Sequence, residues 1–222
     1  MVPPAPSSGD TRYQADMSIF QETRSLEGSA RWKLAQSDND LSIAGQLRAF
    51  RCALRMDLTP ENAPKLAHLL SRADSDANAA SNTIKFLYRH KRPFQVAQGD
   101  VCLSPEGKIA LEKSPDYPSG HTTLSWETGL ILAQLVPKFA DDILARARAF
   151  GESRVVCGVH NLSAVEAGWM TASAVFAMQE ASPFFLSDLD AARGELDGLR
   201  ASAKTNLQGC DAEAQALAKS SY

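Results

Sequence analysis

The chain has 222 residues, a mass of 24.0 kDa and 44% hydrophobic residues, which suits one domain with a sizeable core. Its formal net charge of −3 and pI near 5.8 argue against a nucleic-acid-binding protein, because such proteins usually carry a basic surface. No apolar run approaches the roughly 18–20 residues that span a bilayer, so we expect a soluble protein without membrane insertion.

Residues 1–9 are predicted to form a flexible leader, since they contain neither the basic nor the apolar segment of a signal peptide. Residues 10–222 are expected to form one domain. The four cysteines allow three complete pairings, and their spacings match no zinc-binding pattern. The sequence leaves open whether these cysteines form disulfides or are free residues of the core. The four cysteines are Cys52, Cys102, Cys157 and Cys210.

Apolar residues recur three and four positions apart through most of the chain, and the alternation typical of strands is scarce. This pattern predicts an all-α fold built as a single helical bundle. The predicted helices are Tyr13–Ser25, Ala30–Ser37, Ser42–Leu54, Pro60–Arg72, Ser75–His90, Gly120–Leu135, Lys138–Cys157, Leu162–Ala181 and Ser187–Thr205. The remaining long segment, 93–118, is predicted to be irregular, and a loop of that length in a compact helical domain is more often functional than accidental.

The stretch Pro118-Ser119-Gly120-His121 directly precedes the predicted helix 120–135. Ser119 is a favourable N-cap, Gly120 leaves the backbone accessible, and His121 falls in the first turn. Free amides at a helix start, together with a hydroxyl and an imidazole, can bind an anion beside a proton donor. Read alone, the same residues favour an ordinary capped helix.

Two further stretches carry cations. Lys85 and Arg92 are seven residues apart, nearly two helical turns, so both project from one face and could bind a dianion. Arg154 and His160 are six apart, and Gly158 between them offers a break that would let both face one pocket. Read separately, these stretches also fit a solvated basic face, a surface arginine and a histidine at the edge of the core.

In this order, Lys-x6-Arg-Pro, Pro-Ser-Gly-His and Ser-Arg-x5-His resemble the signature of the type 2 phosphatidic acid phosphatase and vanadium haloperoxidase superfamily. Within it, the chain from about residue 10 to 199 is similar to the soluble bacterial class A non-specific acid phosphatases. The resemblance implies a helical phosphatase domain of that type over residues 10–222. It further implies a periplasmic or secreted enzyme that acts on small phosphomonoesters, needs no metal or other cofactor and is inhibited by vanadate. A homodimer is compatible with it.

The resemblance also assigns roles. His160 matches the nucleophile that forms a phospho-histidine, and His121 matches the general acid that protonates the leaving group. The phosphate-binding positions match Lys85, Arg92, Ser119, Gly120 and Arg154. Phosphoryl transfer depends mainly on positioning and charge stabilisation, which three cations, a hydroxyl and an amide can supply without metal. Since one histidine must begin neutral and the other protonated, we expect an acidic optimum and, with an alcohol acceptor, phosphotransferase activity.

One position departs from the family pattern. Four residues after the nucleophilic histidine the family has an Asp that would accept the Nδ1 proton, whereas this chain has Ala164. We expect Ser163 to orient His160 instead, and Ala164→Asp to raise kcat unless another group already does so. The alternatives are a phosphate-binding pseudo-enzyme weakened by Ala164 and a vanadate-dependent haloperoxidase.

Overall fold

The computed structural model describes residues 2–200, 207–219 and 222, and within them the chain forms helices and no strands. The all-α prediction is therefore confirmed. The α-helices are α1 (Thr11–Thr23), α2 (Ala30–Ser37), α3 (Ile43–Leu54), α4 (Pro64–Tyr88), α5 (Pro105–Glu112), α6 (Gly120–Leu135), α7 (Ala140–Val156), α8 (Leu162–Gln179), α9 (Pro183–Arg200) and α10 (Cys210–Leu217). Residues 201–206, the end of the predicted helix Ser187–Thr205, lie outside the described residues.

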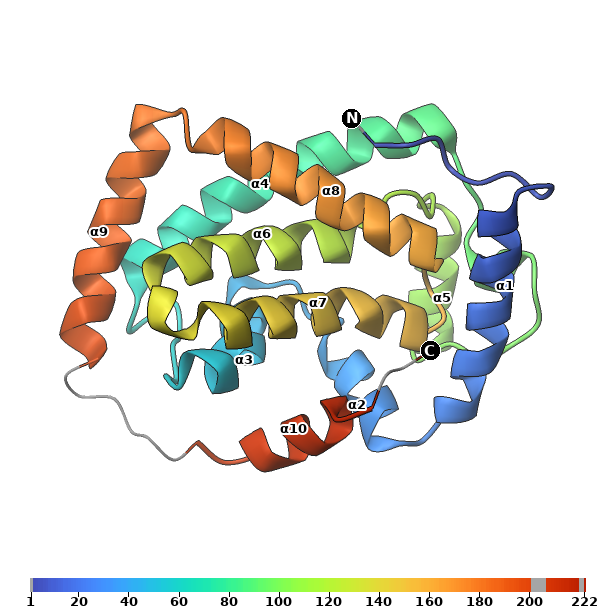
Figure 1. Ribbon diagram of the computed structural model, residues 1–222, viewed down its shortest axis with the longest axis horizontal. Helices are drawn as coiled ribbons and strands as arrows, with labels where there is room; N and C mark the ends of the chain where they lie inside the picture. Colours follow the sequence, from blue (N-terminus) through green and yellow to red (C-terminus); the bar gives the residue numbers. More distant parts are fainter. Residues whose placement is uncertain (1, 201–206, 220–221) are drawn as a thin grey trace.

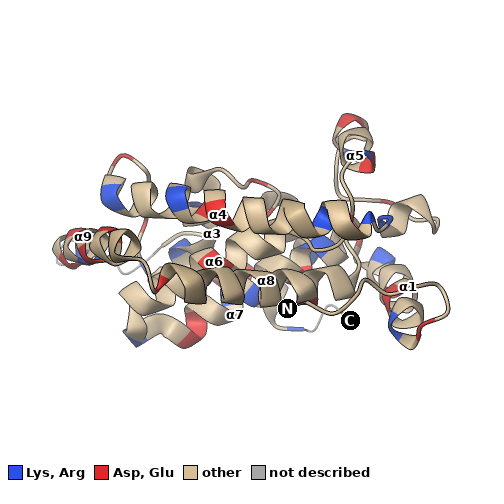
Figure 2. Ribbon diagram, turned by 90° about the horizontal axis from the view of Figure 1, so that it is seen from above, with Lys and Arg blue, Asp and Glu red and all other residues tan. Residues whose placement is uncertain are grey.

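Helix α6 is the centre of the bundle. It packs against α7 and α8, while α4 lies against α6, α8 and α9 (Figure 1). A Cβ atom on Gly129 of α6 would come within 2.5 Å of the Ala147 Cβ of α7, so the absence of a side chain lets these two helices approach closely. Seen from above, α9 lies at one end of the bundle, and α1 and α5 lie at the other (Figure 2).

Several helix boundaries differ from the predictions. The two helices expected at Pro60–Arg72 and Ser75–His90 form one helix, α4, which contains no Gly or Pro after Pro64 to interrupt it. Thr59 and Asn62 form a turn instead of a helix start, with the Thr59 amide donating to Asn62 Oδ1 at 2.8 Å. Helix α9 begins at Pro183, four residues before the predicted start at Ser187, and at this first position the missing N–H of proline costs nothing.

Two short helices were not predicted. Helix α5 lies inside the segment expected to be irregular, where Ser104 accepts a hydrogen bond from the Gly107 amide at 3.2 Å and Pro105 occupies the first helical position. That cap and proline are a start signal of the usual kind. Helix α10 near the C-terminus is held to α3 by the Cys52–Cys210 disulfide.

The second disulfide, Cys102–Cys157, joins the segment before α5 to the end of α7. The Cys102 amide also donates to the Cys157 carbonyl at 3.0 Å. The cysteines are therefore paired, and one of the three pairings left open by the sequence is selected.

The segment predicted to be a flexible leader is packed against the domain. Tyr117 Oη donates to the Pro3 carbonyl at 2.7 Å, and His90 Nε2 lies 3.0 Å from the Pro6 carbonyl. Pro6 itself is buried. The first residues thus cover the stretch that leads into α6.

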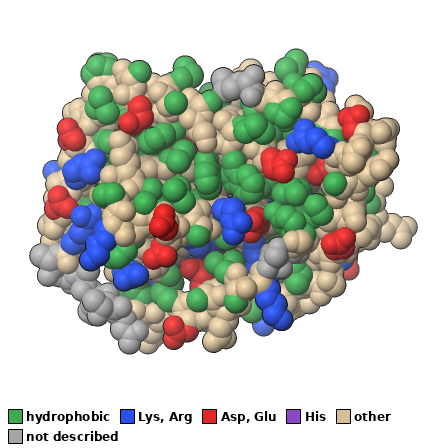
Figure 3. All heavy atoms as spheres, in the orientation of Figure 1, with side chains coloured by type: hydrophobic (Ala, Val, Ile, Leu, Met, Phe, Trp, Pro, Cys, Tyr) green, Lys and Arg blue, Asp and Glu red, His purple; other side chains and the backbone are tan. Residues whose placement is uncertain are grey.

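The surface carries charges of both signs. Figure 3 shows Lys and Arg side chains scattered among acidic, apolar and neutral atoms, without a continuous basic area on that face. Within the described residues, no helix combines the length and apolar character that crossing a membrane requires.

Candidate active site

The predicted site residues lie where one end each of α4, α6, α7 and α8 meet, toward the right-hand side of Figure 1. They are Lys85 in the last turn of α4, Arg92 just after it, Ser119, Gly120 and His121 at the start of α6, Arg154 in the last turn of α7, and His160 just before α8. Nη1 of Arg92 lies 3.0 Å from Nε2 of His160. A Cβ on Gly120 would lie 4.0 Å from Cε of Lys85. The structure therefore brings these elements to one place.

A tight turn at Gly158 brings Arg154 and His160 to the same side. Gly158 has φ +74°, a region that favours glycine, and a Cβ there would lie within 3.0 Å of the Arg24 guanidinium. Arg24 in turn donates to the carbonyls of Val155 and Val156 at the end of α7. The break expected at Gly158 is confirmed, and Arg24 holds it by satisfying carbonyls at the end of the helix.

Lys85 and Arg92 are almost fully buried. The ammonium of Lys85 donates to the carbonyls of Pro115 and Asp116, and Arg92 donates through Nη1 to the Val159 carbonyl at 2.7 Å. Burial, reinforced by the charge of Arg92, lowers the pKa of Lys85 to about 7. Lys85 is therefore a full cation only below neutral pH, unless a bound anion raises its pKa.

Arg154 is fully buried, and its Nε and Nη1 atoms have no hydrogen-bond partner within the described part of the chain. Its Nη2 donates to Asn39 Oδ1, in the α2–α3 loop, at 3.0 Å. A buried guanidinium with free donors is costly unless an anion occupies its place. Nε and Nη1 of Arg154 are therefore available to donate to an anion.

The start of α6 supplies further donors. Ser119 Oγ accepts hydrogen bonds from the Thr122 amide at 3.3 Å and the Thr122 hydroxyl at 2.9 Å. Its own hydroxyl proton stays available for a ligand. The Ser119 amide donates to the Ala164 carbonyl at 2.8 Å, which fixes this turn against the first turn of α8.

The hydrogen bonds of His160 identify its tautomer. Arg92 can only donate, so Nε2 of His160 must accept and carry a lone pair. Nδ1 then carries the proton and donates to Asp116 Oδ1 at 2.8 Å. Burial, and next the charge of Arg92, lower the pKa of His160 well below its usual value. His160 is thus a neutral imidazole with the lone pair of Nε2 facing Arg92.

The prediction that Ser163 orients His160 is wrong. Ser163 Oγ donates to Asp16 Oδ2 at 2.5 Å, and the Ser163 amide donates to Asp16 Oδ1 at 2.8 Å. Asp16 on α1 therefore occupies this hydroxyl, and Asp116 occupies the position expected for Ser163. Sequence analysis missed Asp116 because it lies 44 residues before His160, where no helical spacing connects them.

His121 is half-buried, and its Nε2 lies 3.2 Å from the Asn39 carbonyl, an acceptor, so Nε2 carries a proton. Burial, followed by the charges of Arg154 and His160, lowers the pKa of His121 well below its usual value. A bound phosphate would oppose that shift, because its negative charge offsets Arg154. Asn39 is a second residue that sequence analysis missed.

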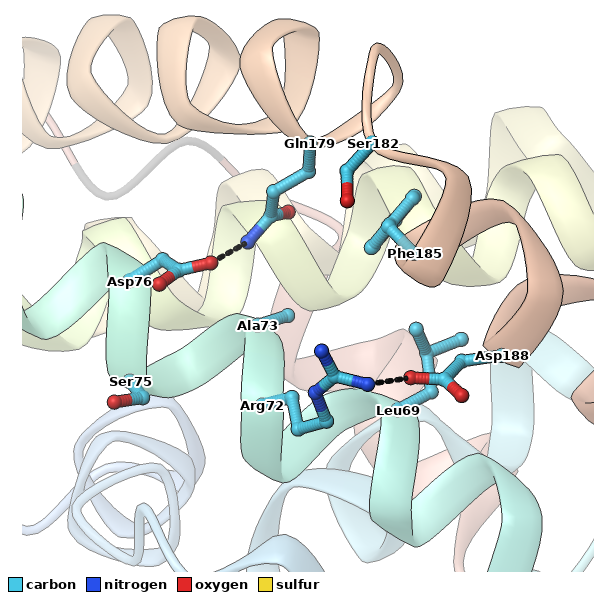
Figure 4. A pocket seen from close by; sticks show the side chains of 9 residues that line it. All are labelled: Leu69, Arg72, Ala73, Ser75, Asp76, Gln179, Ser182, Phe185 and Asp188. Carbon is cyan, nitrogen blue, oxygen red and sulfur yellow. Dashed lines mark hydrogen bonds and ion pairs between the residues drawn. The ribbon is translucent and has the colours of Figure 1, made fainter.

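A cavity of about 250 Å³ lies elsewhere, between α4 and the α8–α9 corner (Figure 4). Its Arg72 is paired with Asp188 at 2.5 Å, and Gln179 donates to Asp76 at 3.2 Å. Its polar groups face one another instead of an empty anion site, so the cavity does not compete with the cluster around His160 for a phosphate.

Comparison with known proteins gives the family of this chain. Residues 70–182 match the model of the PAP2 superfamily, and the chain belongs to that superfamily. It is 40% identical over 202 residues to a protein of Zymomonas mobilis named acid phosphatase, covering 91% of this chain and 76% of the relative. Proteins named non-specific acid phosphatase are also similar. That of Providencia stuartii is 32% identical, covering 90% of this chain and 81% of the relative. That of Salmonella typhi is 33% identical, covering 88% and 78%.

Proposed function

We propose that this protein hydrolyses phosphomonoesters at acid pH through a phospho-histidine on His160, without a metal ion. Its class, acid phosphatase, follows from the superfamily and from relatives that carry this name over most of their length. The observation that carries the mechanism is the tautomer of His160, whose Nε2 lone pair accepts a hydrogen bond from Arg92 Nη1 at 3.0 Å.

The phosphoryl group of the substrate binds among Arg154, Arg92, Lys85, the Ser119 hydroxyl and the Gly120 amide. Its oxygens accept the hydrogen bond from Arg92 that the Nε2 lone pair of His160 accepts in the free protein, and this frees the lone pair. Nε2 of His160 then forms a bond to phosphorus while the bond from phosphorus to the leaving oxygen breaks, and His121 donates a proton to that oxygen. The cations stabilise the equatorial oxygens throughout.

The second half of the reaction, hydrolysis of the phospho-histidine, regenerates the enzyme. His121, now neutral, removes a proton from water, whose oxygen attacks phosphorus as the bond to Nε2 breaks. Inorganic phosphate leaves and both histidines return to their starting protonation states. An alcohol in the place of water gives phosphotransfer by the same step.

Two pKa shifts support an acidic working range. His160 stays neutral at acid pH because burial and Arg92 lower its pKa, so its nucleophile remains available. Lys85, with a pKa of about 7, is charged below neutral pH and loses its charge above it. Phosphate binding should therefore weaken as the pH rises past neutrality.

Location and inhibition follow from the same proposal. Two disulfides favour an oxidising compartment, and the relatives are bacterial, which supports a periplasmic or secreted protein. Vanadate should inhibit by occupying the phosphate position. The relatives named as phosphatases favour hydrolysis over the alternative of a vanadate-dependent haloperoxidase.

The deciding experiment is steady-state hydrolysis of p-nitrophenyl phosphate against pH for the wild type and His160→Ala. We expect kcat to fall by a factor of about 10³ or more, because the covalent route is lost. His68→Ala is a matched control, since that side chain is 64% exposed on α4. Equal rates for wild type and His160→Ala would show that His160 is not the nucleophile. A wild type that binds vanadate without hydrolysing the ester would establish a pseudo-enzyme.

A further inference from the structure

Asp116 lies at the centre of a buried hydrogen-bond network behind the proposed nucleophile. Its carboxylate is fully buried and receives four hydrogen bonds. His160 Nδ1 donates to Oδ1 at 2.8 Å, and the Asn161 side chain donates to Oδ2 at 2.8 Å. The Asn161 amide donates to Oδ1 at 3.3 Å, and His90 Nδ1 lies 3.2 Å from Oδ2.

The fourth donor, His90, must be an imidazolium. Its Nε2 faces the Pro6 carbonyl at 3.0 Å and its Nδ1 faces the Asp116 carboxylate, so both nitrogens meet acceptors and both carry protons. The hydrogen bond to Asp116 raises the pKa of His90, which agrees with this state. Burial alone would raise the pKa of Asp116, but hydrogen bonds from His160 and His90 outweigh it and lower that pKa.

We infer that Asp116 is the positioning residue for His160, held in place from behind by the protonated His90 and by Asn161. This inference rests on the proposed function, since it concerns the same nucleophile. Asp116 keeps the proton on Nδ1, which leaves the lone pair on Nε2, and it stabilises the cationic imidazole of the phospho-histidine. A carboxylate that fixes a histidine tautomer in this way contributes about 10⁴ in rate to serine proteases.

The position of Asp116 also accounts for Ala164. The Ser119 amide donates to the Ala164 carbonyl at 2.8 Å, and Tyr117 and Ala164 belong to one buried apolar cluster, so the segment 116–119 lies on the first turn of α8. Ala164 is fully buried there. A carboxylate at position 164, four residues after His160, would approach the same imidazole nitrogen that Asp116 already contacts. The orienting charge thus comes from the segment before α6 instead of from α8.

As a test, the carboxylate can be transferred from position 116 to position 164. We would measure kcat and KM for p-nitrophenyl phosphate in Asp116→Asn, Ala164→Asp and the double variant. Asp116→Asn should lower kcat by roughly 10²–10⁴ with KM changed only a few-fold, because the amide no longer enforces the tautomer. Ala164→Asp alone should give no gain in kcat. The double variant should recover at least about tenfold over Asp116→Asn, since a carboxylate again reaches Nδ1.

Asp74→Asn is a matched control for removing a buried carboxylate. Asp74 receives a hydrogen bond from Gln46 and lies eleven residues before Lys85 on α4, about 16 Å along the helix. Its kcat should equal that of the wild type. An Asp116→Asn variant with wild-type kcat, or a double variant without recovery, would overturn the inference. An inactive wild type would instead overturn the proposed function.

A measurement on the unmodified protein avoids the case in which Asp116→Asn fails to fold. The chain has only four histidines, so ¹⁵N-histidine NMR, assigned with His160→Ala, His68→Ala and His121→Gln, can read each ring. His160 should carry its proton on Nδ1, and His90 should be doubly protonated at the pH of maximal activity. A His160 ring protonated on Nε2 alone would contradict the role of Asp116, whatever the activity of the variants.

Discussion

Replacing His121 with Gln should nearly abolish hydrolysis of an alkyl phosphate such as glycerol 2-phosphate while sparing much of the hydrolysis of p-nitrophenyl phosphate. A general acid matters most when the leaving oxygen is strongly basic, and nitrophenolate departs readily as an anion. We expect kcat/KM to fall by about 10²–10⁴ for the alkyl ester and by much less for the aryl ester. The measurement is kcat/KM for both esters at several acidic pH values.

The protonation state of His121 depends on whether a phosphate is bound. In the free protein, burial and the charge of Arg154 lower the pKa of His121, which disfavours the protonated acid. In the proposed mechanism the phosphate dianion binds at the free donors of Arg154, and its negative charge raises the pKa of His121 again. His68→Gln, on the exposed face of α4, is the control and should leave both esters unaffected. An equal loss for the two esters would mean that His121 binds phosphate and is not the acid.

Sequence reasoning selected residues that the structure brings together, because these residues sit at helix ends that local signals mark. Ser119 caps α6, Gly158 ends the turn after α7, and both were identified from residue type alone. The sequence could not show which groups meet those residues across the bundle. Asp116 reaches His160 over 44 residues and Asn39 reaches Arg154 over 115, distances that only the packing of the helices sets.

The errors have equally local causes. The predictions divided α4 between Arg72 and Ser75, but no Gly or Pro interrupts residues 65–88, so the helix continues through this point. Ser163 was assigned to His160 because it lies three residues away, close enough on a helix. Its amide and hydroxyl both bind Asp16 instead, a partner on α1 that lies 147 residues earlier. Short-range spacing therefore predicted the position of a residue on its helix, whereas tertiary contacts determined the hydrogen-bond partner of its side chain.

The largest expected effect on stability comes from Glu127 on α6. Glu127 is fully buried, and neither carboxylate oxygen has a hydrogen-bond partner within residues 2–200 and 207–219. Burial, and next the charges of Asp74 and Asp76, raise its pKa from 4.5 to about 9. Asp76 pairs with Gln179 at the wall of the cavity in Figure 4, and burial raises the pKa of Asp74 from 3.8 to about 7. Glu127 is therefore neutral in the folded protein over the acidic range.

This shift makes the fold more stable at acid pH. Between pH 4.5 and about 9 the unfolded chain has lost the Glu127 proton while the folded chain keeps it, so the free energy of unfolding falls as the pH rises. Asp74 contributes in the same direction only up to about pH 7, because above that value it is ionised in both states. From about pH 7 to 9, Glu127 alone of these two acids lowers the stability.

Glu127→Gln should remove that loss, since the amide has nearly the same shape and does not ionise. Each pH unit is worth up to about 1.4 kcal/mol, so by pH 9 the variant should gain up to about 3 kcal/mol more than at pH 7. For a chain of this size that corresponds to roughly 5–10 °C in Tm. The test is thermal unfolding of wild type, Glu127→Gln and Asp74→Asn from pH 4 to 9. The stability difference between Asp74→Asn and wild type should grow between about pH 4 and 7 and stay constant above pH 7. A constant difference between wild type and Glu127→Gln over the whole range would show that Glu127 ionises normally in the fold.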